Sequence, residues 1–187
     1  MAEAPTRRAA LALGAAAALL PPVGRAMASG ATAYDFRLDA LEGGSLDLGQ
    51  FRGRPLLVVN TASFCGYTPQ YAGLQRLHAR YAPRGLVVLG VPSNDFNQES
   101  GEASKIKEFC EATFGVEFPM AMPAHVRGPG AHPLFAWLAA QGGGPPRWNF
   151  HKYLVGRDGV SVRGYPSRVE PDAPELLRAV EAALAAA

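Results

Sequence analysis

The hydrophobic and polar positions of this chain follow two different periods along its length. Leu56–Asn60 and Leu86–Val91 are continuous apolar runs, which are typical of strands buried on both faces of a sheet. Between them, Thr68–Tyr81 carries apolar residues at helical spacing, and a proline-glycine stretch ends this segment. A strand, a helix and a strand in this order predict a right-handed unit with two parallel neighbouring strands.

Shorter elements are expected on both sides of this unit. Four further strands are predicted over Tyr34–Leu38, Ser45–Leu48, Asn149–Val155 and Val160–Tyr165. Three further helices are predicted over Ala103–Phe114, His132–Ala140 and Ala173–Ala186. An Asp-Gly turn between the last two strands indicates an antiparallel hairpin. We therefore expect an α/β domain over residues 29–187, with a central mixed β-sheet flanked by helices.

The first 28 residues differ from the rest of the chain. Two arginines precede the alanine-rich apolar stretch Ala9–Leu20, and an Ala-Met-Ala site ends at Ala28. This pattern predicts an export signal over residues 1–28 that is cleaved after Ala28, and the paired arginines favour the twin-arginine route. The protein would then be periplasmic or secreted. The alternative is an alanine-rich extension that is not a signal.

The net positive charge of the chain comes from these first 28 residues. The formal net charge is +2, and three arginines and one glutamate lie within residues 1–28, so the remainder is formally neutral. A neutral domain lacks the basic surface that nucleic acids or anionic membranes attract. We therefore expect no nucleic-acid partner and no stable membrane association.

The chain contains two cysteines, Cys65 and Cys110. In an exported protein such a pair can form a structural disulfide, although a domain of this size does not need one, so a reversible bridge is the sharper alternative. Without a C-x-x-C pair, a thiol–disulfide oxidoreductase is disfavoured. A metal site is also disfavoured, because the histidines are scattered without ligand spacing, at His78, His125, His132 and His151.

Cys65 is the strongest candidate for chemistry. It follows a buried strand and precedes a predicted helix start, at which Thr68 would cap and Pro69 would take the first helical position. The N–H groups and the dipole of a helix N-terminus favour thiolate over thiol. The sequence therefore predicts a reactive nucleophile, against the alternative of a small buried hydrophobic residue.

Three more residues suit a cysteine that reduces peroxides, because such a reaction needs hydrogen-bond donors beside the sulfur. Gln98 follows the second parallel strand, at the edge of the sheet where Cys65 follows the first. Trp148 and Asn149 precede the hairpin and offer an indole N–H and an amide. Taken singly, Gln98 could be a solvated loop residue and Trp148 a half-buried core aromatic.

Together these segments resemble the glutathione peroxidase family. The likeness rests on residues 60–71 (NTASFCGYTPQY), 92–96 (PSNDF), 98–99 (QE) and 148–159 (WNFHKYLVGRDG), in that order, and spans residues 34–184. The resemblance implies a thioredoxin-like fold without a cofactor, and it implies reduction of hydrogen peroxide and organic hydroperoxides through a Cys65 sulfenic acid. It also implies four catalytic residues, Cys65, Gln98, Trp148 and Asn149.

The chain departs from the family pattern in several places. Many members use selenocysteine, so cysteine implies a slower enzyme. Phe64 stands where lysine is frequent, and the loop around Gln98 is one residue shorter, with Ser93 and Ser100 in place of the usual cysteine and proline. The chain also lacks the insertion that tetrameric members use for assembly, so we expect a monomer.

The resemblance implies that Cys110 is the resolving cysteine of the thioredoxin-dependent branch, which forms an intramolecular disulfide with the peroxide-reactive cysteine. The residue pattern instead places Cys110 on an apolar helix face with Ile106, Phe109 and Phe114. Both interpretations hold if the helix unfolds locally after Cys65 is oxidised. The reductant would be a thioredoxin-like protein or glutathione.

Two alternatives remain for the function. A peroxiredoxin-like thiol peroxidase usually places threonine before its cysteine and uses an arginine, whereas Thr68 follows Cys65 here. A non-catalytic redox sensor would use oxidation of Cys65 and Cys110 to change the binding of a partner protein. Rapid multiple turnover with a thiol reductant distinguishes an enzyme from such a sensor.

Overall fold

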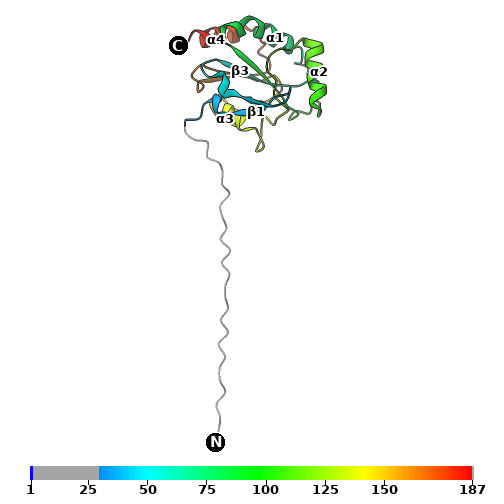
Figure 1. The fold of residues 1–187 in the computed structure, drawn as a ribbon, viewed down its shortest axis with the longest axis vertical. Coiled ribbons are helices and arrows are strands. Elements are labelled where there is room, and N and C mark those ends of the chain that lie inside the picture. Colours follow the sequence, from blue (N-terminus) through cyan, green and yellow to red (C-terminus); the bar gives the residue numbers. More distant parts are fainter. Residues whose placement is uncertain (2–29, 187) are drawn as a thin grey trace.

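The computed structural model describes Met1 and residues 30–186 (Figure 1). The strands in these residues are β1 (Arg37–Asp39), β2 (Ser45–Asp47), β3 (Leu56–Thr61), β4 (Val87–Pro92), β5 (Lys152–Val155) and β6 (Val162–Tyr165). The α-helices are α1 (Gln70–Tyr81), α2 (Ala103–Phe114), α3 (Pro133–Gln141) and α4 (Pro174–Ala185). Apart from Met1, the predicted export signal and its cleavage position after Ala28 lie outside the described residues.

The two continuous apolar runs form adjacent strands of a four-stranded sheet with the order β4-β3-β5-β6. β3 and β4 are parallel, with Leu56 opposite Val87 and Thr61 opposite Pro92. Because α1 connects them, the predicted strand-helix-strand unit is confirmed. β5 pairs antiparallel with both β3 and β6, so the C-terminal hairpin and the mixed sheet are confirmed as well.

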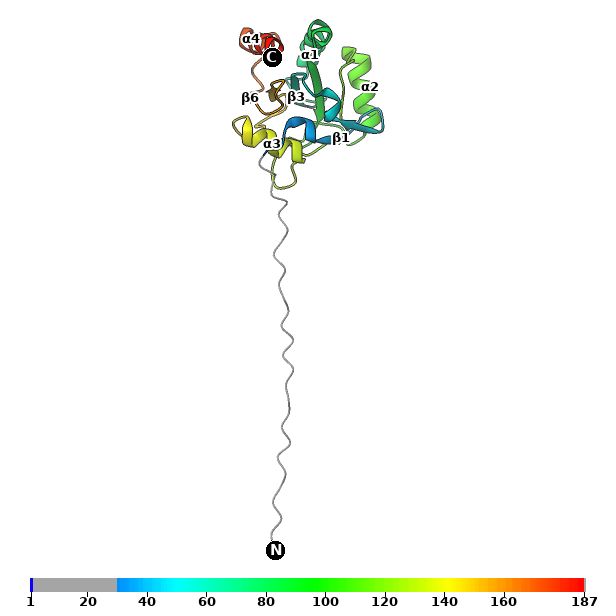
Figure 2. The ribbon, with the colours of Figure 1, turned by 60° about the vertical axis from the view of Figure 1, so that its left-hand side comes forward.

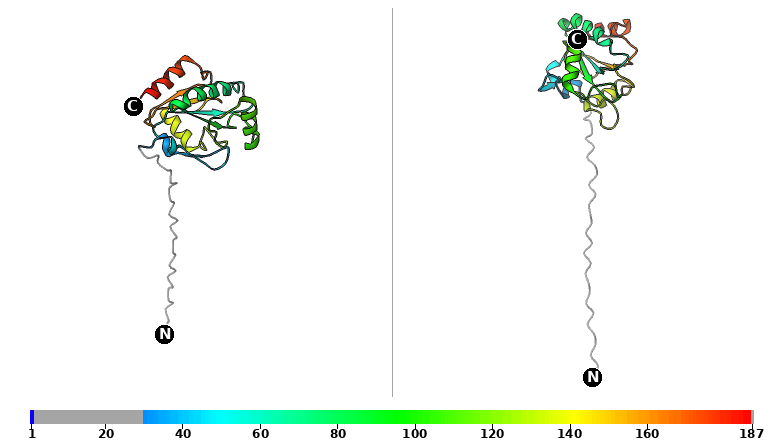
Figure 3. Two further views of the ribbon diagram at one scale, coloured as in Figure 1. Left: turned by 45° about the horizontal axis from the view of Figure 1, so that its top comes forward. Right: turned by 90° about the vertical axis from the view of Figure 1, so that its right-hand side faces the viewer.

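Helices and hairpin cover both faces of this sheet, as Figures 2 and 3 show. Leu57 and Val59 point into a hydrophobic cluster that the sheet shares with α1, α2 and α4. Leu56 and Val58 point into a second cluster, shared with α3 and the β1–β2 hairpin. Successive side chains of a strand face opposite sides of the sheet, so a strand covered on both faces is apolar along most of its length.

The first predicted strand is wrong at its N-terminal end. Ala33–Asp35 forms a 3₁₀ turn, and β1 begins only at Arg37. The Asp35 carboxylate accepts hydrogen bonds from the backbone N–H and the hydroxyl of Thr32, at 2.8 and 2.9 Å. This local side-chain pairing competes with extended structure, and it explains why an alternating pattern did not form a strand here.

The hairpin strand predicted to begin at Asn149 begins at Lys152 instead. Phe150 has a φ of 61°, which lies outside the extended region and interrupts the strand. Among the described residues, no helix is long and apolar enough to cross a membrane.

Candidate active site

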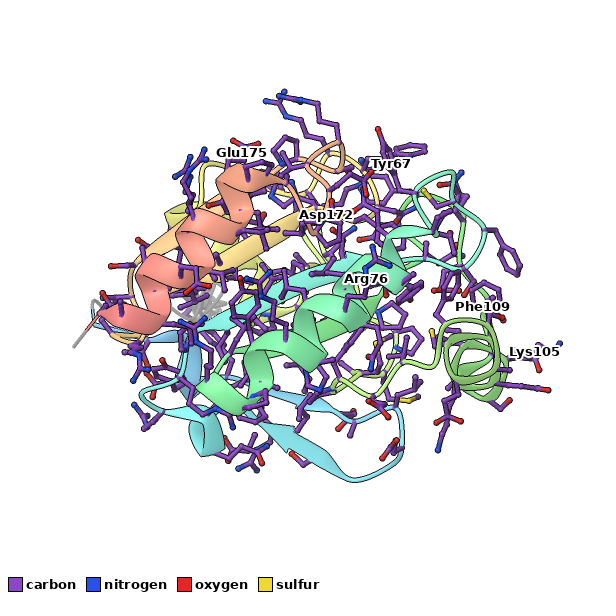
Figure 4. All side chains as sticks on the ribbon, turned by 90° about the horizontal axis from the view of Figure 1, so that it is seen from above. Tyr67, Arg76, Lys105, Phe109, Asp172 and Glu175 are labelled. Atoms are coloured by element: carbon purple, nitrogen blue, oxygen red, sulfur yellow. The ribbon has the colours of Figure 1, made fainter. Side chains whose placement is uncertain are left out.

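The sheet topology brings three separate segments to one edge of the sheet. Cys65 follows β3 and Gln98 follows β4, and these two parallel strands end at the same edge. β5 runs antiparallel to β3, so Trp148 and Asn149, which precede β5, belong to this edge too. Sites in open α/β sheets gather at the carboxyl ends of the parallel strands. Figure 4 looks onto α1 and α4, and the labelled Tyr67 lies where the chain enters α1.

Cys65 lies in a tight turn between β3 and α1, and its exposed fraction is 7%. Its backbone N–H donates to the Thr68 hydroxyl at 3.0 Å, and that hydroxyl donates to the Ala62 carbonyl at 2.9 Å. The backbone N–H of Tyr67 donates to the Cys65 Sγ at 3.4 Å. A backbone donor directed at the sulfur stabilises negative charge on it. The turn therefore holds the thiol in place and supplies one donor to its thiolate form.

The predicted helix start was wrong in detail. α1 begins at Gln70, and no side chain caps its N-terminus. The Thr68 hydroxyl is hydrogen-bonded within the Cys65 turn instead, to the Cys65 N–H and the Ala62 carbonyl. The donor that reaches the sulfur thus comes from the turn and not from the first turn of α1.

Gln98 and Asn149 meet directly. The Asn149 Nδ2 group donates to Gln98 Oε1 at 2.9 Å, and Asn149 is fully buried while Gln98 is half-buried. The Gln98 carbonyl accepts a hydrogen bond from the backbone N–H of Phe64 at 3.0 Å, which ties the Gln98 loop to the residue before Cys65. The structure thus joins the three segments that carry the predicted site residues through two hydrogen bonds.

The backbone on both sides of this amide pair is strained. Among the described residues, the non-glycine residues with positive φ are Asn97 (56°) and Phe150 (61°). Asn97 immediately precedes Gln98, and Phe150 immediately follows Asn149. A bulky residue in the left-handed region costs about 1–3 kcal/mol, and such residues persist only where their surroundings hold them. The strain is therefore concentrated at the two amides that the sequence singled out.

Trp148 is 41% exposed, and its ring packs against Phe96 with centroids 5.3 Å apart. Its carbonyl accepts a hydrogen bond from the Asn60 side chain at 3.1 Å, which ties this segment to β3. Phe64 is 68% exposed. Two large apolar side chains therefore reach solvent from the segments that hold Cys65 and Asn149.

Cys110 differs from Cys65 in its surroundings. It lies on the buried face of α2 with an exposed fraction of 1%, and both cysteines are free thiols within one hydrophobic cluster. Burial raises the pKa of Cys110 to about 11, and the Glu99 and Glu111 carboxylates add to this rise, against an opposing effect of the Tyr71 hydroxyl. In this conformation Cys110 is thus protonated at neutral pH and is a poor nucleophile.

Sequence reasoning missed Lys152, which hydrogen-bonds the residue that follows Asn149. This lysine is fully buried, and its Nζ donates to Gln70 Oε1 at 2.6 Å and to the Phe150 carbonyl at 2.7 Å. Burial lowers the pKa of Lys152 to about 7, and the Glu170 carboxylate opposes this shift. The available signal was the position of a lysine at the start of the apolar run Tyr153–Val155, in a strand that is buried throughout.

The lowered pKa of Lys152 predicts a pH dependence of stability. The unfolded chain keeps this lysine protonated up to a pKa near 10.5, whereas the folded chain releases the proton from about pH 7, so the unfolding free energy rises with pH in between. From pH 7 to pH 8 we expect a rise of about 1 kcal/mol. Urea denaturation at several pH values should show this rise of the unfolding free energy in the wild type and no rise in Lys152→Met. The same dependence on pH in both proteins would contradict the prediction.

The arrangement suits nucleophilic chemistry at sulfur. One buried cysteine has a backbone donor at its sulfur, and two side-chain amides and an indole belong to the same edge of the sheet. Among the described residues, no three His, Cys, Asp or Glu side chains gather into a group that could hold a metal ion. The catalytic roles of Cys65, Gln98, Trp148 and Asn149 stay predictions at this point.

Known proteins similar to this chain are peroxide-reducing enzymes by name. A family model described as glutathione peroxidase matches residues 33–139, a range that includes Cys65, Gln98 and Cys110 and ends before Trp148. A hydroperoxy fatty acid reductase of Synechocystis sp. is 47% identical over 152 residues, which cover 75% of this chain and 90% of the relative. A glutathione peroxidase-like peroxiredoxin of Chlamydomonas reinhardtii is 40% identical over 156 residues, which cover 80% of this chain and 96% of the relative.

Solved structures agree with this similarity. The crystal structure of T. cruzi GPX1 is 30% identical with a TM-score of 0.66, and the match covers 82% of this chain and 97% of that one. A thiol:disulfide interchange protein of the thioredoxin family from Chlorobium tepidum TLS, 17% identical, shares the fold with a TM-score of 0.61 over 80% of this chain and 92% of its own. The predicted thioredoxin-like fold is therefore confirmed.

Proposed function

Because this chain belongs to the glutathione peroxidase family and is a peroxidase, we propose that Cys65 is the thiol that reduces hydroperoxides. The observation that carries this proposal is the hydrogen-bonded pair of Gln98 and Asn149, which is tied to the residue before Cys65. Amide donors held close to a buried thiol suit peroxide reduction, because they can stabilise the charge that develops on the leaving oxygen.

The first step is attack of the Cys65 thiolate on one oxygen of the hydroperoxide. The new S–O bond forms while the O–O bond breaks, so sulfur is oxidised to a sulfenic acid and the leaving oxygen, once protonated, becomes water or an alcohol. Negative charge moves from sulfur to the leaving oxygen during this step. Donors placed at the leaving oxygen therefore stabilise the transition state more than the ground state, whereas a donor at the sulfur favours the reactive thiolate.

Gln98, Asn149 and Trp148 are the proposed donors. In the observed hydrogen bond Asn149 uses one N–H and Gln98 uses its oxygen, so the Gln98 Nε2 group remains available, with no acceptor among the described residues. The indole N–H of the half-exposed Trp148 is available to a bound peroxide in the same way. Asn149 then acts in part by orienting Gln98.

The proposed substrates are hydrogen peroxide and organic hydroperoxides. Hydrogen peroxide needs only the donors, whereas an organic hydroperoxide also brings an apolar tail. Phe64 and Trp148 are exposed aromatic residues beside Cys65 and Asn149, and they offer contact area for such a tail. The relative from Synechocystis sp. is named a hydroperoxy fatty acid reductase, which supports this substrate class.

Cys110 is the proposed resolving cysteine. Its thiolate would attack the Cys65 sulfenic acid, so that an S–S bond forms and the departing hydroxide leaves as water after protonation. Because Cys110 is buried and has a pKa of about 11, α2 must open locally before this step. A thioredoxin-like dithiol would then reduce the disulfide. The export signal expected at residues 1–28 would require this donor to work outside the cytoplasm.

Replacing Cys110 with serine should separate the two halves of this cycle. With thioredoxin, thioredoxin reductase and NADPH, we expect steady turnover of Cys110→Ser to stop while one equivalent of peroxide per protein is still consumed. The first step does not need Cys110, whereas regeneration does. Stopped-flow consumption followed by steady-state assay measures both, and turnover at the wild-type rate would refute the resolving role.

A further inference from the structure

Lys152 is a buried lysine that has no part in the peroxide reaction proposed above. Its side chain is fully buried, and burial of an ammonium group is costly even when hydrogen bonds compensate it. An apolar residue of the same length, such as methionine, would avoid that cost. The two groups to which Lys152 Nζ donates indicate why a lysine is present here.

The first of these groups is the carbonyl of Phe150, which accepts from Lys152 Nζ at 2.7 Å. The backbone N–H of Phe150 donates to the Asn60 carbonyl at 2.6 Å, so both polar backbone atoms of this strained residue are held. With φ at 61°, Phe150 turns the chain between β5 and Asn149. The direction in which the Asn149 amide points depends on this turn.

The second group is the amide of Gln70, whose Oε1 accepts from Lys152 Nζ at 2.6 Å. Gln70 is the first residue of α1, directly after the turn that holds Cys65. Its Nε2 group donates to the Ser167 carbonyl at 2.8 Å and to Glu170 at 3.0 Å, so the Gln70 side chain is fixed at both ends. Lys152 thus joins the helix that follows Cys65 to the turn that follows Asn149.

We propose that Lys152 is a positioning residue for the peroxide reaction, because its buried ammonium group holds the Phe150 turn against α1 and thereby presents Asn149 to Gln98 beside Cys65. This inference rests on the proposed roles of Cys65, Gln98 and Asn149. Lys152 itself touches neither the sulfur nor a bound peroxide. Its effect is on the orientation of the donors, which decides how well the transition state is stabilised.

The test compares two reactions of the same cysteine in Lys152→Met. Oxidation of Cys65 by hydrogen peroxide needs the oriented donors, whereas alkylation by iodoacetamide needs only an accessible thiolate. We expect the rate constant for oxidation to fall about 10- to 100-fold. The rate of alkylation at Cys65, followed by peptide mass, should stay within about threefold of the wild type, because the backbone donor at the sulfur is the Tyr67 N–H, which belongs to the Cys65 turn and not to the amide pair. Lys105→Met, which changes an exposed lysine on α2, is the matched control and should leave both rates unchanged.

The other outcomes are equally decisive. Unchanged oxidation in Lys152→Met overturns the proposal, and an equal fall of oxidation and alkylation overturns it too, because Lys152 would then act on the thiolate. If Lys152→Met does not fold, Gln70→Met is the alternative variant, because it removes one of the two hydrogen bonds of Lys152. We expect a slower oxidation of Cys65 with unchanged alkylation in this variant. Unchanged oxidation would refute the proposal. A wild-type protein that does not react with peroxide would refute the proposed function instead.

Discussion

Cys65→Ser is expected to abolish peroxide reduction. A serine hydroxyl stays protonated at neutral pH and is a poor nucleophile toward the O–O bond, so neither the sulfenic acid nor any later intermediate can form. Loss of the nucleophile in other enzymes lowers kcat on the order of 10⁶-fold, so we expect the rate to fall to that of the uncatalysed reaction. Peroxide consumption by equimolar protein, followed over time, measures this loss.

The same substitution at the other cysteine is the matched control for this result. Cys110→Ser should consume one equivalent of peroxide at the wild-type rate, because Cys110 enters only after Cys65 has been oxidised. Both variants exchange a buried thiol for a hydroxyl, so a shared effect on folding would appear in both. Retention of the single-turnover reaction in Cys65→Ser would show that another group is the nucleophile.

Asn149→Ala is expected to slow the oxidation of Cys65 by about 10²- to 10³-fold. The substitution removes the donor that holds Gln98 Oε1 at 2.9 Å, and it leaves the Gln98 amide free to rotate. Two donors are therefore impaired by a single change. The rate constant for oxidation is measured by stopped-flow fluorescence, since the exposed Trp148 neighbours the site.

A double variant distinguishes a coupled pair from two independent donors. Because Gln98 and Asn149 are hydrogen-bonded, the losses in Gln98→Ala and Asn149→Ala should not add, and the double variant should be little slower than the slower single one. Gln141→Ala, an exposed amide at the end of α3, should leave the rate unchanged. Fully additive losses, or a normal rate in Asn149→Ala, would contradict the pairing.

Much of the fold followed from hydrophobic pattern alone. β3 and β4 are buried on both faces, and apart from Asn60 and Thr61 at the end of β3 their sequences are apolar, which is typical of central strands. The C-terminal hairpin followed from its Asp-Gly turn. The segment around Tyr34 was assigned wrongly, because a short Thr-Asp hydrogen bond decided its conformation and periodicity carries no information about such a contact.

The place of the candidate site in the fold was predictable from the sequence, but its geometry was not. Strand topology predicted that Cys65 and Gln98 lie at one edge of the sheet, since the carboxyl ends of neighbouring parallel strands meet there. Asn149 was added by its place in the motif order. The left-handed turn at Phe150 and the buried contacts of Lys152 depend on groups distant in the sequence. No local pattern could reveal them.

Thr68 shows the same limit at a single residue. Its position before a proline and an apolar periodic segment favours a helix cap, and the preference is correct as a general rule. In the structure, the hydroxyl binds the Cys65 backbone and the Ala62 carbonyl instead. The Cys65 turn and the helix N-terminus compete for this hydroxyl, and the sequence alone does not show which of them binds it.

Peroxide consumption by the purified chain tests the central claim most directly, with thioredoxin, its reductase and NADPH in one assay and glutathione in a parallel one. We predict rapid multiple turnover with thioredoxin, together with a disulfide between Cys65 and Cys110 that mass spectrometry detects when the reductant is omitted. Oxidation of Cys65 without turnover in either assay would contradict the proposed cycle and favour a redox sensor. Absence of any Cys65 oxidation would contradict the assignment of the nucleophile itself.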